Sequence, residues 1–148
     1  MGRLRRVFRL STQKKILLFQ ATLLLTATRL GLHVLSFARL RSLLARYVGV
    51  GGAKHGALQH GALDPIVWAV EAVSRQIPAI GTCLTQALAA HVLLARRGVQ
   101  SDLRIGVMRD GSGKFIAHAW LEKDGRILIG EAHRQGYNPM PVLNVLKP

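Results

Sequence analysis

The chain has 148 residues, of which 49% are apolar and 19% are charged. This length and hydrophobicity suit one domain with a packed core and exclude an intrinsically disordered chain. Lys and Arg total 21 against 7 Asp and Glu, and residues 1–63 hold eleven basic side chains and no acidic one. The front of the chain is therefore expected to meet an anionic partner. A single cysteine, Cys83, excludes an intramolecular disulfide and a thiolate zinc cluster.

Residues 1–48 predict a basic segment of two helices. Ser11 offers an N-cap just before an uncharged run, 16–28, which is shorter than the ~20 apolar residues of a membrane span. A secretory signal peptide is disfavoured because another helical pattern follows directly, with no evident mature start. That second helix is expected over about 33–48. Its apolar side chains recur at helical spacing, with Arg39 and Arg46 opposite them: Phe37, Leu40, Leu44 and Tyr47.

These front helices allow two interpretations. They either pack on the core with a solvated basic face, or they form a surface that docks anionic lipid or an acidic protein. A nucleic-acid partner is disfavoured, because the basic region lacks interleaved aromatic side chains and any recognition-module motif. Residues 49–63 are rich in glycine and predict a linker. We expect no metal at His55 and His60, which have no thiol or carboxylate close by before Asp64.

Two helices are predicted in the back half. Asp64 as N-cap and Pro65 at the first helical position open one, with a core-facing stripe, and Pro78 ends it. The stripe consists of Ile66, Val70 and Val73. Thr82 is a good N-cap for the next helix, which makes Cys83 its first residue. The helix dipole and the unpaired N–H groups there favour a thiolate and a nearby oxyanion. The alternative is a cysteine that merely packs like alanine.

The remaining pattern predicts an antiparallel sheet. Strands are expected over 102–107, 115–122 and 126–131, with Asp124-Gly125 as a two-residue hairpin loop. A regular ladder then pairs Lys123 with Arg126. In the same register Trp120 lies opposite Ile129, and His118 lies opposite Glu131. With Cys83 this supplies a nucleophile, a base and an acid that orients the base. The alternative for His118 is a core histidine, and a one-residue slip moves Glu131 to the other face.

Two motifs of the back half resemble those of a known family. Thr82-Cys83-Leu84 opens a Leu- and Ala-rich helix, and Ala117-His118-Ala119-Trp120-Leu121-Glu122 precedes Asp124-Gly125. In combination these motifs resemble the leader peptidase of lasso peptide biosynthesis, the stand-alone peptidase half of the B protein. That family belongs to the transglutaminase-like, papain-related cysteine peptidases. The resemblance covers most of the chain.

The resemblance implies a chemistry. Cys83 would attack the peptide bond between leader and core of a ribosomally made precursor, and His118 would move the proton. The third residue of the family is usually an Asp after the hairpin. Glu131 stands in that region here, so it replaces the Asp or the triad reduces to a dyad. Trp120 and Thr82 are expected to contact the substrate, and no cofactor or metal is expected.

The resemblance also implies an architecture and partners. We expect an α+β papain/transglutaminase-like fold, with the Cys83 helix on a small antiparallel sheet over 64–148 and N-terminal helices covering one side. The expected partners are the precursor, a PqqD-like leader-recognition protein and a cyclase of the asparagine-synthetase type. The expected location is the cytoplasm. For residues 1–48 three contacts stay open: the leader-recognition protein, an acidic part of the leader, and the inner membrane, where they would bind peripherally. The alternatives are another acyl-transfer enzyme, such as a transglutaminase or amide ligase, or a non-enzymatic membrane- or partner-binding protein.

Overall fold

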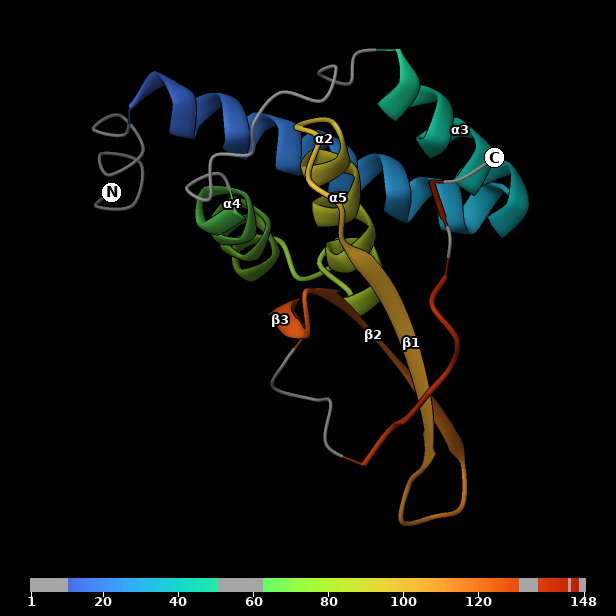
Figure 1. Ribbon diagram of the computed structural model, residues 1–148. Coiled ribbons are helices and arrows are strands. Elements are labelled where there is room, and N and C mark those ends of the chain that lie inside the picture. Colours follow the sequence, from blue (N-terminus) through green and yellow to red (C-terminus); the bar gives the residue numbers. More distant parts are fainter. Residues whose placement is uncertain (1–10, 51–62, 131–135, 144, 147–148) are drawn as a thin grey trace.

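The computed structural model describes residues 11–50, 63–130, 136–143 and 145–146. Within them, four helices precede a four-stranded antiparallel sheet with the strand order β3-β2-β1-β4 (Figure 1). The helices are α2 (Thr12–Val34), α3 (Phe37–Gly49), α4 (Leu63–Gln76) and α5 (Cys83–Ala95), and the strands are β1 (Asp102–Arg109), β2 (Phe115–Lys123), β3 (Arg126–Ile129) and β4 (Asn138–Pro139).

The two front helices form as predicted but divide at a different place. The Ser11 hydroxyl caps α2 by accepting from the Lys14 amide at 3.5 Å. The helix then runs for 23 residues, well beyond the uncharged run. The second helix starts later than expected because the Ser36 side chain caps it, accepting from the Arg39 amide at 3.4 Å. Leu40 of the predicted apolar face is 4% exposed.

The two back helices also form as predicted, with one correction. α4 begins at Leu63, so Asp64 lies in its first turn and is not the N-cap. There a carboxylate still interacts favourably with the helix dipole. The predicted stripe of α4 is buried. α5 begins at Cys83 after Thr82, as expected, and Gly98 just beyond its end has a φ of +73°, which favours glycine.

The hairpin between β2 and β3 confirms the turn and corrects the register. Asp124 and Gly125 both have positive φ, as a two-residue primed turn requires, and Lys123 pairs with Arg126. A bulge then shifts the ladder between Leu121 and Glu122. Because the bulge places one extra residue on β3, Ile129 pairs with Leu121. The predicted pairing of Ile129 with Trp120 is therefore wrong.

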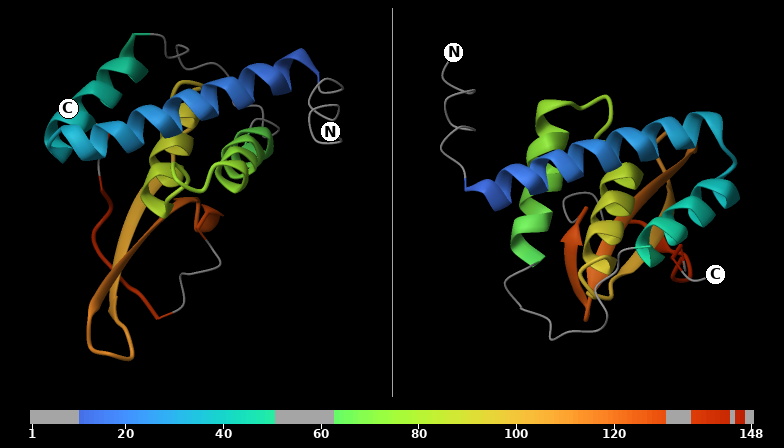
Figure 2. Two further views of the ribbon diagram at one scale, coloured as in Figure 1. Left: turned by 180° about the vertical axis from the view of Figure 1, so that it is seen from behind. Right: turned by 90° about the horizontal axis from the view of Figure 1, so that it is seen from above.

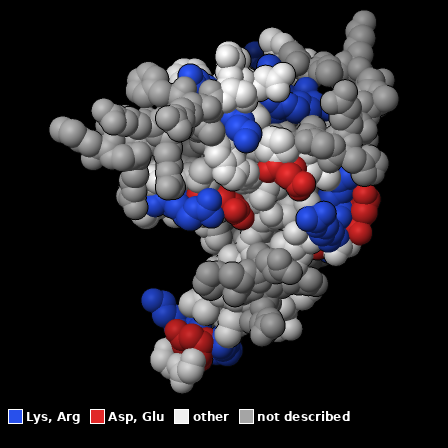
Figure 3. All heavy atoms as spheres, turned by 90° about the vertical axis from the view of Figure 1, so that its left-hand side faces the viewer, with Lys and Arg blue, Asp and Glu red and all other residues white. Residues whose placement is uncertain are grey.

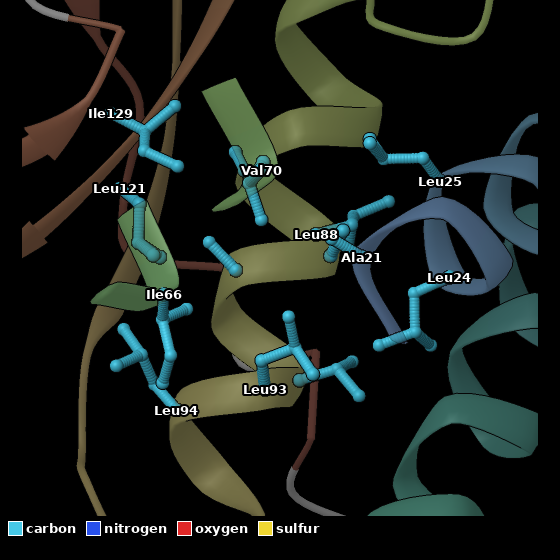
Figure 4. Close-up of a cluster of buried hydrophobic side chains, with 14 of the residues drawn as sticks. Ala21, Leu24, Leu25, Ile66, Val70, Leu88, Leu93, Leu94, Leu121 and Ile129 are labelled. Atoms are coloured by element: carbon cyan, nitrogen blue, oxygen red, sulfur yellow. The ribbon is translucent and has the colours of Figure 1, made fainter. Parts of the chain in front are cut away.

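The helices cover one face of the sheet, and α2 lies across α4 and α5 (Figures 1 and 2). α5 is the central element, since its residues Thr85 and 87–94 are all buried. One apolar cluster joins α2, α4 and α5 to the inner face of the sheet (Figure 4). The α+β fold is thus confirmed, with the helix that Cys83 opens packed on a small antiparallel sheet.

Candidate active site

The strand β2 separates the core from the candidate site. Successive side chains of a strand point to opposite faces. Ala119 and Leu121 belong to the core cluster that includes α5. His118 and Trp120 alternate with them, so their side chains leave the other face of the sheet. Both are nevertheless buried, at 7% and 1% exposure, because further residues close over that face.

The orientation of the His118 ring is fixed by a backbone carbonyl. Its Nε2 lies 2.9 Å from the carbonyl oxygen of Gly130. A carbonyl only accepts, so Nε2 carries the proton and donates it. In the neutral ring the lone pair is therefore on Nδ1, which is the nitrogen that can act as a base. Gly130 has a φ of +94°, a conformation that glycine adopts readily and other residues rarely.

Two aromatic side chains pack beside this imidazole. The ring centroids of His118 and Trp120 are 6.3 Å apart at an interplanar angle of 22°, and those of His118 and Tyr137 are 5.4 Å apart at 41°. Gly106 of β1 pairs with His118 and makes room for both. A Cβ on Gly106 would lie 2.9 Å from Trp120 Cζ3 and 2.9 Å from Tyr137 Cβ. The missing side chain therefore allows the three rings to gather.

A charged pair holds the indole of Trp120. Its Nε1 donates to Glu122 Oε2 at 3.3 Å, and Glu122 Oε1 accepts from Arg104 Nε at 2.6 Å. Hydrogen bonds between charged groups at this distance are strong and directional. With 1% exposure, Trp120 packs against the imidazole and offers almost no surface to solvent. Its contact with a substrate, like that of Thr82, stays a prediction.

Cys83 lies at the uncapped start of α5. It is partly buried and packs against the core cluster. Thr82 occupies the N-cap position, but its side chain makes no capping hydrogen bond; its hydroxyl lies 3.1 Å from that of Thr85 instead. The first N–H groups of a helix have no partner within the helix. The amides at the start of α5 are therefore not occupied by a cap and suit an oxyanion.

The helix that begins at Cys83 contacts β2, but it packs on the face of the strand that carries Ala119 and Leu121, opposite the face that the His118 side chain leaves. In the described parts of the chain, however, no hydrogen bond joins Cys83 Sγ to His118. Glu131 lies outside the described residues, so its predicted role is untested. The carbonyl of Gly130 orients the base instead. Sequence reasoning missed this carbonyl because any residue supplies one, and the only signal was a glycine directly after a strand.

The contact of Tyr137 with His118 was also not expected, because the tail shows little regular pattern. It follows from β4, whose pairing with β1 brings this residue over the sheet. Among the described residues, no group of three His, Cys, Asp or Glu side chains is placed to hold a metal ion. The described residues bring to the site one thiol, one imidazole and backbone amides.

A comparison with protein families gives one match that bears on this site. The model of the transglutaminase-like superfamily matches residues 22–142, which include both Cys83 and His118. No match was found among curated proteins or among solved structures.

Proposed function

Because the chain belongs to the transglutaminase-like superfamily, we propose that it is a cysteine peptidase that removes the leader from a lasso peptide precursor. Members of this superfamily are usually cysteine-based acyl-transfer enzymes. The observation that carries the proposal is the His118 imidazole. A carbonyl holds its Nε2–H beside two aromatic rings, and the helix that begins with Cys83 contacts the same strand from its other face.

The proposed reaction proceeds in two acyl transfers. Nδ1 of His118 takes the thiol proton, and Cys83 Sγ attacks the carbonyl carbon of the leader–core peptide bond. The resulting oxyanion lies at the uncapped amides of α5. The imidazolium then gives its proton to the leaving amine of the core, and the C–N bond breaks. Water, deprotonated by the same imidazole, hydrolyses the thioester and releases the leader as a carboxylic acid.

The proposal requires the imidazole to come within hydrogen-bond reach of the thiol when substrate binds. Nucleophile and base are often too far apart or poorly aligned in substrate-free enzymes and tighten in the complex. The Gly130 carbonyl can hold the imidazole ring in one orientation throughout the reaction. It accepts from Nε2 in both the neutral and the protonated ring, so the ring keeps its orientation through the cycle.

The partners in the proposal come from the motifs that resemble the lasso leader peptidases. They are the precursor, a PqqD-like protein that binds the leader, and an asparagine-synthetase-like cyclase that closes the released core.

We expect the purified chain to cleave the precursor when the leader-binding protein is present. Cys83→Ala should abolish cleavage. Product mass separates the alternatives, because a peptidase adds one water across the cut bond and a transglutaminase or ligase releases ammonia in a new linkage.

Thiol alkylation tests the pair without any substrate. At neutral pH, Cys83 should react with iodoacetamide at least about tenfold faster in the wild type than in His118→Ala, since the thiolate is the reacting form. His33→Ala, which removes an exposed histidine on α2, is the matched control and should leave the rate unchanged. Slow alkylation at equal rates in wild type and His118→Ala would mean that Cys83 is a packed side chain and that the chain is not a cysteine enzyme.

A further inference from the structure

One face of α2 is apolar and yet exposed. Phe19 is 70% exposed and Val34 is 80% exposed, although both lie on a helix whose other side is in the core. Apolar residues that are exposed to solvent recur along the whole of α2 at helical spacing. This exposed stripe consists of Ile16, Phe19, Leu23, Ala27, Leu30 and Val34. At ~100° per residue the six lie within an arc of about 80°, which makes a continuous strip about 27 Å long.

The stripe is separate from the face that holds α2 on the protein. The buried residues of α2 centre roughly 130° away around the helix, and this helix contacts α4 and α5. The stripe therefore points away from the rest of the domain. Single exposed apolar side chains are common on protein surfaces, but a contiguous strip of this size marks an interaction site. By length and composition α2 is also long and apolar enough to cross a membrane, although 33% of its apolar stretch is buried within the protein.

The charges beside the stripe indicate the nature of its partner. Lys15 and Arg29 lie along one flank of α2, about 80–120° from the centre of the stripe. Residues 11–50 contain six basic side chains and no acidic one. On the side of the molecule drawn in Figure 3, Lys and Arg appear at the top without Asp or Glu, whereas side chains of both charges are mixed lower down. An apolar strip with cations beside it is the pattern of a helix that lies in the surface of an anionic membrane.

We propose that α2 binds the surface of a bilayer containing anionic phospholipid. The exposed stripe enters the boundary between headgroups and acyl chains, the basic flank contacts lipid phosphates, and the rest of the domain stays in water. A spanning orientation is excluded by the core, because it would strip Leu24 and Leu25 from their contacts with the other helices. Pairing with a second copy is disfavoured, since each copy carries a formal charge of +14.

Vesicle flotation with the full chain tests this proposal, and it is independent of the proposed enzyme activity. Vesicles of phosphatidylglycerol and phosphatidylcholine in equal parts should carry the protein upward, and pure phosphatidylcholine vesicles should bind it at least about tenfold more weakly. Raising NaCl from about 0.1 to about 0.5 M should reduce binding by about tenfold, because salt screens the attraction.

A matched pair of substitutions locates the contact. Phe19→Glu places a charge in the stripe and should reduce vesicle binding at least about tenfold. Phe115→Glu introduces the same change at a residue of similar exposure (63%) in the β1–β2 hairpin, and it should bind as the wild type does. Circular dichroism serves as the check that both variants are folded.

Four results would overturn the proposal. One is equal binding to neutral and anionic vesicles, and a second is unchanged binding of Phe19→Glu. The third is a lipid-free dimer, seen by light scattering, that Phe19→Glu dissociates, because that would assign the stripe to a second copy of the chain. Protein that resists alkaline extraction from the vesicles would likewise contradict a surface-bound helix.

Discussion

His91 should make the stability of the protein depend on pH. It lies in the middle of α5, is 8% exposed, and its Nδ1 is 2.9 Å from the Ser101 hydroxyl oxygen. Burial lowers the pKa of His91 from 6.5 to about 4, and the nearby Asp102 carboxylate opposes this shift only in part. The folded protein therefore keeps this imidazole neutral at pH values where the unfolded chain would protonate it.

The sign and size of the pH effect on stability follow from the difference between the pKa of His91 in the folded and in the unfolded protein. Between pH 6.5 and pH 4 the unfolded state binds a proton at His91 that the folded state does not, so acid favours unfolding. The stabilisation from this residue is fully present above pH 6.5 and is lost as pH falls toward 4. A pKa difference of 2.5 units corresponds to about 3 kcal/mol in full. Between about pH 7 and about pH 5, we expect a loss of about 2 kcal/mol.

Urea unfolding at a series of pH values measures this loss. His91→Gln removes the titrating group, so its free energy of unfolding should change much less between pH 7 and pH 5, whatever its absolute stability. His33→Gln, on the surface of α2, should retain the wild-type slope. The pKa of Asp110 is also lowered, by its hydrogen bonds to Ser112 and Lys114, but its effect falls below this pH range. Two results would show that His91 does not cause the pH dependence. One is a wild-type free energy of unfolding that stays constant between about pH 7 and about pH 5, and the other is an equal pH dependence in His91→Gln.

Two further predictions concern the ring cluster at the site. Gly106→Ala should lower the free energy of unfolding in urea by about 1–3 kcal/mol, because the new methyl group meets Trp120 and Tyr137 at 2.9 Å. The control is Gly111→Ala. Gly111 has open space around it, so this change should lower the free energy of unfolding by less than about 0.5 kcal/mol. Tyr137→Ala should slow alkylation of the thiol about threefold or more while leaving the unfolding transition cooperative, since it removes the ring that packs beside His118; an unchanged rate would limit Tyr137 to a structural role.

The helices were readable from the sequence because their signals are local. Ser11 and Thr82 mark helix starts, and periodic apolar residues mark the buried faces. The division between α2 and α3 was misplaced although Ser36 offered a capping signal, because Leu and Ala continue the helical pattern on both sides of it. The exposed stripe of α2 was not separable from its core face, since both are apolar and only the packing of the other helices distinguishes them.

The sheet was predictable up to the point where its ladder becomes irregular. Asp124-Gly125 determined the turn and the first pair, but a bulge has no fixed sequence signal, and it changed the partner of Ile129 from Trp120 to Leu121. The Gly130 carbonyl and the Tyr137 ring escaped prediction for a related reason. Backbone oxygens are not encoded by residue type, and a two-residue strand such as β4 is too short to show alternation.

The burial of α5 has a consequence for how the reacting groups could meet. Four residues of α5 are completely buried: Ala87, Leu88, Ala89 and Ala90. The helix that begins at Cys83 therefore cannot shift without disturbing the close packing of the helices and strands around it. The imidazole stands on β2, whose buried residues include His118 and Trp120, but the outer neighbour of β2 is β3, which is only four residues long. We therefore expect β3, and not α5, to move when substrate binds, and a crosslink between β2 and β3 should slow turnover.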